Sequence, residues 1–184
     1  MLKRFYPSLT VIGAVWLVFV LNHGLCGGQL TAHGIVPRHL ASLPGILWAP
    51  FLHVSYQHLA ANTLPLLILG GVLCARSPRE FIQVTVLGTI LSGTLTWLLA
   101  RNACHVGASG LIFCYFGFLA SRAWFERTFG TLCLSLLCLV FYGGMVAGVL
   151  PRADGVSWES HAAGLVTGVA LAKLLPRRPR NSWR

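Results

Sequence analysis

Six apolar segments with short charged stretches between them divide the chain. A helix that crosses a bilayer needs about 20 mainly apolar residues. Charged residues make up only 10% of the chain and the mean hydropathy is +0.72, whereas a soluble domain carries about 25% charged residues. The pattern predicts an all-α protein, a polytopic six-transmembrane-helix bundle with lipid as its solvent. The six expected helices cover residues 5–25, 58–75, 81–100, 109–124, 132–150 and 161–175.

The fourth and sixth segments are short for a full span, so we expect them to begin below one membrane surface. The one long connection, about 26–57, is apolar but contains Pro37, Pro44 and Pro50. It cannot form one regular helix, and we expect it to lie in the membrane interface beside the bundle. Residues 1–184 are thus predicted to form a single membrane domain, with a basic cytoplasmic tail at about 176–184.

The distribution of positive charge predicts an orientation. If both termini are cytoplasmic, eleven of the fourteen lysines and arginines fall on the inner side, and only Arg38, Arg101 and Arg152 fall outside. This asymmetry follows the positive-inside rule and predicts an even number of spans. The formal net charge of +10 does not indicate a nucleic-acid partner, because the basic residues lie in short clusters between apolar segments and form no basic face with interleaved aromatic residues.

A serine and a histidine lie at the ends of two of these segments. Ser109 lies in Gly107-Ala108-Ser109-Gly110, and His161 begins the last segment, ahead of Gly164 and Gly168. Under the predicted topology both face the outer side. A serine needs a nearby base to become a nucleophile, and the small-residue spacing after His161 would let two helices touch closely. The alternatives are that these glycines only pack helices and that His161 only caps one.

A third motif lies on the second segment. His58 and Asn62 are four residues apart, so they share one helix face, and His53 precedes them. The His58 and Asn62 side chains can donate hydrogen bonds to a developing oxyanion. They could instead only join helices together.

Together the motifs His53-x4-His58-x3-Asn62, Gly107-Ala108-Ser109-Gly110 and His161-x2-Gly164-x3-Gly168 resemble the rhomboid family of intramembrane serine proteases. Their order, and their places on the second, fourth and sixth segments, match over nearly the whole chain. The resemblance implies the minimal six-helix bacterial form, with an active site that opens to the periplasmic side. The composition fits a bacterial cell inner membrane, and an organelle membrane stays open as the alternative.

The resemblance also implies roles for these residues. Ser109 would be the nucleophile and His161 the general base of a dyad without an acidic third member. The Ser109 amide, His58 and Asn62 would form the oxyanion hole, and His53 would help to shape the cavity. The fifth segment would be a lateral gate for single-pass membrane protein substrates. No metal or cofactor is implied.

Two positions depart from the family pattern. The residue four places after the serine, which packs on the catalytic histidine, is often tyrosine in bacterial members and is Phe113 here. The ring is kept, so we expect catalysis to survive. The Trp-Arg pair of many first loops is absent, and Pro37-Arg38 is not assigned its role.

Other readings have less support. A catalytically inactive rhomboid-like protein that binds transmembrane helices would be expected to lack the nucleophile or the base, and both are present. A transporter or channel usually carries charge near the midplane or paired broken helices. The zinc motif His-Glu-x-x-His is absent, and Asp154 is the only aspartate, so zinc and aspartyl proteases are excluded. Whether Cys26 and Cys104 form a disulfide stays open.

Overall fold

The computed structural model describes residues 2–151 and 155–176. Its long helices are α1 (Tyr6–Gly24), α3 (Tyr56–Arg76), α4 (Pro78–Leu99), α5 (Ser109–Glu126), α6 (Phe129–Tyr142) and α7 (Trp158–Leu174). A 3-10 turn, η1 (Leu2–Phe5), leads into α1, and a 3-10 helix, η5 (Gly143–Val149), continues α6. The connection between α1 and α3 holds short helices only: η2 (Gln29–His33), η3 (Leu40–Ser42), α2 (Gly45–Trp48) and η4 (Ala49–Phe51).

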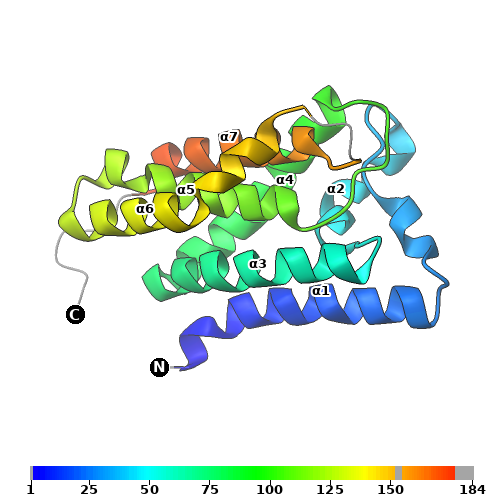
Figure 1. The fold of residues 1–184 in the computed structure, drawn as a ribbon, viewed down its shortest axis with the longest axis horizontal. Helices are drawn as coiled ribbons and strands as arrows, with labels where there is room; N and C mark the ends of the chain where they lie inside the picture. Colours follow the sequence, from blue (N-terminus) through cyan, green and yellow to red (C-terminus); the bar gives the residue numbers. More distant parts are fainter. Residues whose placement is uncertain (1, 152–154, 177–184) are drawn as a thin grey trace.

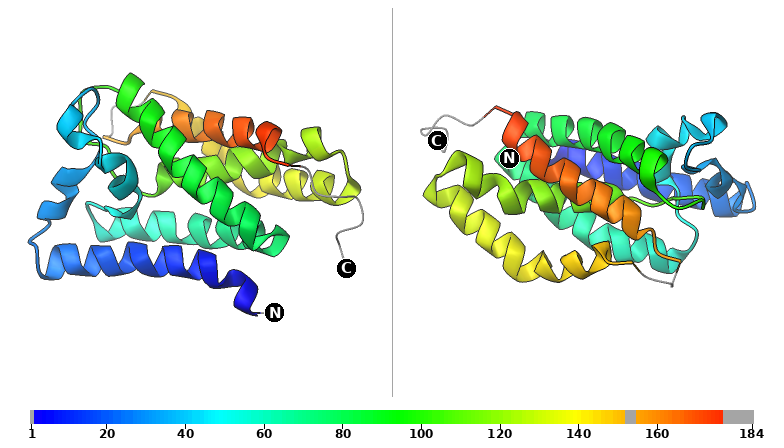
Figure 2. Two further views of the ribbon diagram at one scale, coloured as in Figure 1. Left: turned by 180° about the vertical axis from the view of Figure 1, so that it is seen from behind. Right: turned by 90° about the horizontal axis from the view of Figure 1, so that it is seen from above.

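The helices lie side by side as a bundle (Figure 1). The short helices between α1 and α3 gather at one end, and η1 and the last turn of α7 lie at the other (Figures 1 and 2). Within the described residues, four helical stretches are long and apolar enough to cross a membrane: Leu2–Gly24, Tyr56–Arg76, Pro78–Leu99 and Phe129–Val149. The chain is therefore an all-α, multi-pass membrane protein. The expected count of six is not reached by length and composition, because α7 has 17 residues and the 18 residues of α5 include Arg122 and Glu126.

Side chains at the helix ends explain several boundaries. Ser55 caps α3 by accepting a hydrogen bond from the His58 amide. Ser77 is the C-cap of α3 and the N-cap of α4, so the two helices meet at one residue. Pro78 follows at the first position of α4, where a proline is well tolerated. Thr128 and Thr131 form a capping box at the start of α6, which satisfies backbone donors that would otherwise be exposed to lipid.

The α5 helix is the centre of the bundle. Residues 111–119 are all buried, and α5 contacts α3, α4, α6 and α7. A helix that is apolar on every side is expected to be enclosed in this way. Its closest neighbour is α7. A Cβ atom at Gly164 would overlap the carbonyl oxygen of Gly110, and one at Gly168 would overlap that of Cys114. Glycine at these positions lets the two backbones touch.

At the far end of α5 from Ser109, two arginines and two glutamates form a buried cluster. Arg76 binds Glu80 at 3.0 Å and Glu126 at 2.9 Å, and Arg122 binds Glu126 at 2.8 Å and Glu80 at 3.3 Å. Arg122 is fully buried and also donates to the carbonyl groups of Ala172 and Pro176. The cluster thus joins the ends of α3, α4, α5 and α7. The expected basic tail lies outside the described residues from 177 onward, as do Arg152 and Asp154.

Candidate active site

Ser109 is the first residue of α5 and follows a sharp turn. Gly107 has φ +114°, a conformation that favours glycine, and a Cβ atom there would lie 2.6 Å from the His58 ring. The Gly107 amide donates to the Ala49 carbonyl at 2.8 Å. Ala108 precedes the helix without a side-chain cap, so the first amides of α5 point beyond the helix end, where an oxyanion could accept hydrogen bonds.

His161 lies in the first turn of α7, four residues after the cap residue Ser157. Its ring stacks on Phe113, with ring centres 4.2 Å apart and planes 8° from parallel. Its Nδ1 lies 2.9 Å from the Gly148 carbonyl oxygen. Because a carbonyl only accepts, Nδ1 carries the ring hydrogen whenever the ring is neutral. The lone pair is then on Nε2, which is the tautomer that a general base needs.

Ser109 and His161 line one cavity of about 600 Å³. His58 and Asn62, on successive turns of α3, line the same cavity. Asn62 donates one amide hydrogen to the His58 carbonyl at 2.8 Å, which fixes the side chain relative to the helix. These four residues therefore bring a hydroxyl, two imidazoles and a carboxamide from three helices to one cavity, which Gln57, His105 and Ser157 also line. This donor and base set fits acyl transfer through a serine.

The sequence matches the Rhomboid domain family over residues 41–178. This chain belongs to the rhomboid family. Two mycobacterial relatives are described as uncharacterized proteins: one from Mycobacterium tuberculosis is 37% identical over 95% of this chain and 76% of its own length, and one from Mycobacterium leprae is 36% identical over 95% and 72%. RHOMBOID-like protein 4 of Arabidopsis thaliana is 31% identical over 75% of this chain and 35% of its own length.

His53 occupies a different place in this rhomboid from His58 and Asn62. It is 1% exposed and is not among the residues that line the cavity with Ser109. Its ring centre lies 4.9 Å from that of His58, and its Nε2 accepts a hydrogen bond from the Ala108 amide at 3.4 Å. Burial, with the nearby His58, lowers the pKa of His53 to about 4. The ring therefore stays neutral and can go on accepting from the residue before the nucleophile.

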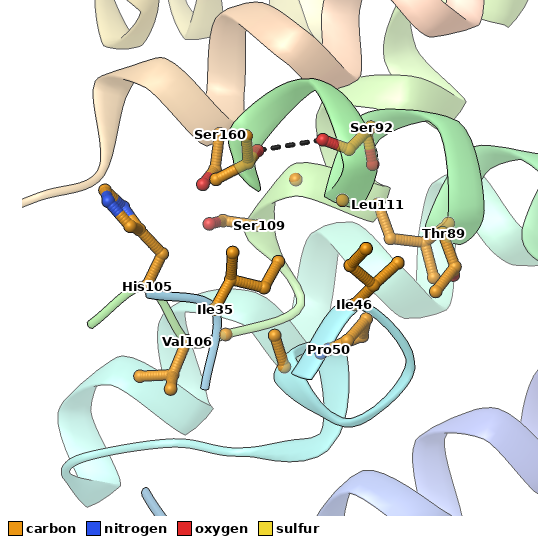
Figure 3. A pocket seen from close by; sticks show the side chains of 15 residues that line it. Ile35, Ile46, Pro50, Thr89, Ser92, His105, Val106, Ser109, Leu111 and Ser160 are labelled. Carbon is orange, nitrogen blue, oxygen red and sulfur yellow. Dashed lines mark hydrogen bonds between the residues drawn. The ribbon is translucent and has the colours of Figure 1, made fainter. Parts of the chain in front are cut away.

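A second, smaller cavity of about 30 Å³ is also lined by Ser109. This is room for one or two water molecules. Figure 3 shows Ser109, Ser160 and His105 at one end of it and Ile46 and Thr89 toward the other. Ser92 and Thr96 of α4 also contribute to its wall, where the Thr96 hydroxyl donates to the Ser92 carbonyl at 2.8 Å.

The sequence reasoning missed three groups near this site. The Gly148 carbonyl was not predicted, because an apolar run does not distinguish a 3-10 helix from an α-helix. The pair Gly143-Gly144 is the one sequence signal for a change of helix type there. His105 and Ser157 were overlooked because a histidine is common at a wet interface. Cys26 and Cys104, considered for a disulfide, are both free thiols.

Proposed function

We propose that this rhomboid is an intramembrane serine endopeptidase that hydrolyses peptide bonds of single-pass membrane proteins. One observation carries the proposal: Ser109 and His161 line the same cavity, and His161 is held in the tautomer of a base by the Gly148 carbonyl. The Phe113 ring supports the histidine from one face. A backbone carbonyl therefore does the orienting that a carboxylate does in many serine proteases.

In this proposal Ser109 Oγ attacks the scissile carbonyl carbon while His161 Nε2 takes the hydroxyl proton. The negative charge develops on the substrate oxygen, where the Ser109 amide, His58 and Asn62 stabilise it. The imidazolium then gives its proton to the leaving amine, and the C–N bond breaks. Water attacks the acyl-enzyme ester, again with His161 as base, and releases the acid product and Ser109.

We further propose a six-span topology in the cell inner membrane, with both termini cytoplasmic and the cavity open to the periplasmic side. Support comes from the helix ends. The start of η1 and the end of α7 lie at one end of the bundle, opposite to the connection between α1 and α3 (Figure 1), and the lysines and arginines are biased toward one side. The α5 helix is buried at the centre of the bundle, and α7 packs along it and against α4.

Substrate access is proposed between α3 and α6. An apolar cavity of about 540 Å³ lies between these helices and is lined by Leu64, Ile68, Leu137 and Phe141 among others. The α6 helix lies at the edge of the bundle (Figure 2) and most of its side chains face outward. A substrate helix could therefore enter by displacing α6, with little of the central core disturbed.

The direct test is cleavage of single-pass reporter proteins by purified protein in liposomes. We expect the native chain to cleave a reporter and to be labelled by a fluorophosphonate, and Ser109→Ala to lose both. His161→Ala should reduce turnover by at least about 10³-fold, because a serine without its base is a poor nucleophile. Binding of reporter helices without cleavage by the native chain would instead support the non-enzymatic alternative.

A further inference from the structure

His105 lies in the connection between α4 and α5, four residues before Ser109. It is 3% exposed, although it comes from a loop. Its backbone exchanges two hydrogen bonds with Ile35, at 2.9 and 2.8 Å, which joins the α1–α3 connection to the segment that leads to the nucleophile. Neither the apolar pattern nor the proposed reaction accounts for a buried imidazole at this position.

The hydrogen bonds of the His105 ring have a defined direction. Nε2 lies 3.0 Å from the Arg101 carbonyl oxygen, so in the neutral ring Nε2 carries the hydrogen and Nδ1 is the acceptor. Nδ1 is hydrogen-bonded to the Ser157 hydroxyl, which must therefore donate. The Ser157 oxygen is then left to accept, and the Ser160 hydroxyl at 2.7 Å and the Ser160 amide at 3.4 Å donate to it.

This chain of bonds ends beside the proposed base. Ser157 is the N-cap of α7, and its carbonyl accepts the His161 amide at 3.2 Å. One imidazole thus links the segment ahead of Ser109 to the first turn of the helix that carries His161. Arg101 makes parallel links, from its guanidinium to the Val156 carbonyl at 2.8 Å and to Glu159 at 3.5 Å. The ion pair is weakened because the Arg101 side chain is 38% exposed and its charge is screened by solvent.

We propose that His105, through Ser157, is a positioning residue that holds the first turn of α7 against the segment before Ser109 and so sets the separation of nucleophile and base. The kinetic part of this proposal rests on the proposed function. Close packing at Gly164 and Gly168 fixes α7 against α5 farther along. The clamp of His105 and Ser157 fixes it at the end where the reacting groups lie.

The test uses paired variants of the full chain in liposomes. His105→Ala and Ser157→Ala remove the clamp. His105→Asn keeps an acceptor near Nδ1 but cannot act as an acid or base at neutral pH, and Ser157→Thr keeps both the hydroxyl and the cap. We expect the alanine variants to lower kcat by about 10- to 100-fold with KM changed by less than about twofold, since small misplacements of reacting groups cost rate rather than binding.

His105→Asn and Ser157→Thr should stay within about fivefold of the native kcat. The double variant with both alanines should fall no further than the slower single variant, because both substitutions break the same contact. A native kcat in His105→Ala would overturn the proposal. So would a His105→Asn variant as slow as His105→Ala, because it would indicate proton transfer by His105.

Hydrogen exchange separates this proposal from the proposed function. In the Ser109→Ala background, where no turnover is expected, His105→Ala should speed exchange of the Ser160 and His161 amides, and His105→Asn should not. Unchanged exchange in both variants would overturn the clamp, whatever the activity. Should the native chain cleave nothing and resist labelling, the proposed function fails, and faster exchange in His105→Ala would still support the clamp.

Discussion

Among the described residues, two uncharged groups contact the His161 ring, the Phe113 ring and the Gly148 carbonyl. Neither brings a formal charge into the apolar interior, so neither carries the desolvation cost of a buried carboxylate. The carbonyl dipole and the face of the ring still favour an imidazolium when one forms. These two contacts therefore orient the base without adding a formal charge of their own.

The Gly148 position provides a sharp test of this arrangement. A Cβ atom there would lie 2.9 Å from Phe113 Cζ and 3.3 Å from His161 Nδ1. We expect Gly148→Ala to push the ring from its stack and to lower kcat by about 10-fold or more. Gly144→Ala is the matched control in the same 3-10 helix, because its Cβ would meet nothing within 4 Å. Equal activity of the two variants would contradict a role for this carbonyl.

At this scale the sequence predicted the reactive groups but not the groups that hold them. Ser109, His161, His58 and Asn62 stand out because polar residues are costly in apolar segments, and the structure brings them to one cavity. A backbone carbonyl has no sequence signature. Its direction depends on local φ and ψ values, which the apolar pattern leaves undetermined.

At the scale of helices, the contact of α5 with α7 depends on the absence of side chains. The small-residue spacing from His161 to Gly168 predicted this close approach, and the structure confirms that the glycines meet the α5 backbone. The fifth segment differs from its expected single helix. It divides into α6 and η5. The sequence did not predict this division, because an apolar run has the same appearance in an α-helix and in a 3-10 helix.

Gly168→Ala tests this packing. The added Cβ would overlap the Cys114 carbonyl oxygen and lie 2.7 Å from the Phe118 amide, so the helices must separate. We expect a loss of about 1–3 kcal/mol in the free energy of unfolding together with lower activity. Gly71→Ala on α3, where a Cβ meets nothing within 4 Å, should be neutral or slightly stabilising. Thermal unfolding in detergent would measure both, and equal effects would contradict the close contact.

At the scale of the whole molecule, the all-α multi-pass architecture followed from composition and apolar length alone. The buried charge cluster did not. Glu80 and Glu126 lie in the first turn of α4 and the last turn of α5. Which arginines they bind depends on how α3, α4 and α5 are arranged around one another, and a single sequence carries no record of such contacts.

Glu126→Gln should show what this cluster contributes. It leaves Arg76 and Arg122 with one carboxylate between them at buried positions, and removing one partner of a buried ion pair costs about 3–5 kcal/mol. We expect a clearly lower unfolding temperature, with kcat of the folded fraction nearly unchanged because Ser109 is at the other end of α5. Arg79→Gln, which changes an exposed charge, is the control. A similar unfolding temperature for both variants would contradict the proposed stabilising role of the cluster.

The same cluster bears on how the chain enters the bilayer. Ribosomes make the N-terminal part first, so Arg76 and Glu80 are synthesised before Arg122 and Glu126. The α5 helix carries two ionised groups, yet each meets an opposite charge supplied by the earlier hairpin of α3 and α4. The partners that offset the charges of the central helix are thus made before it during synthesis.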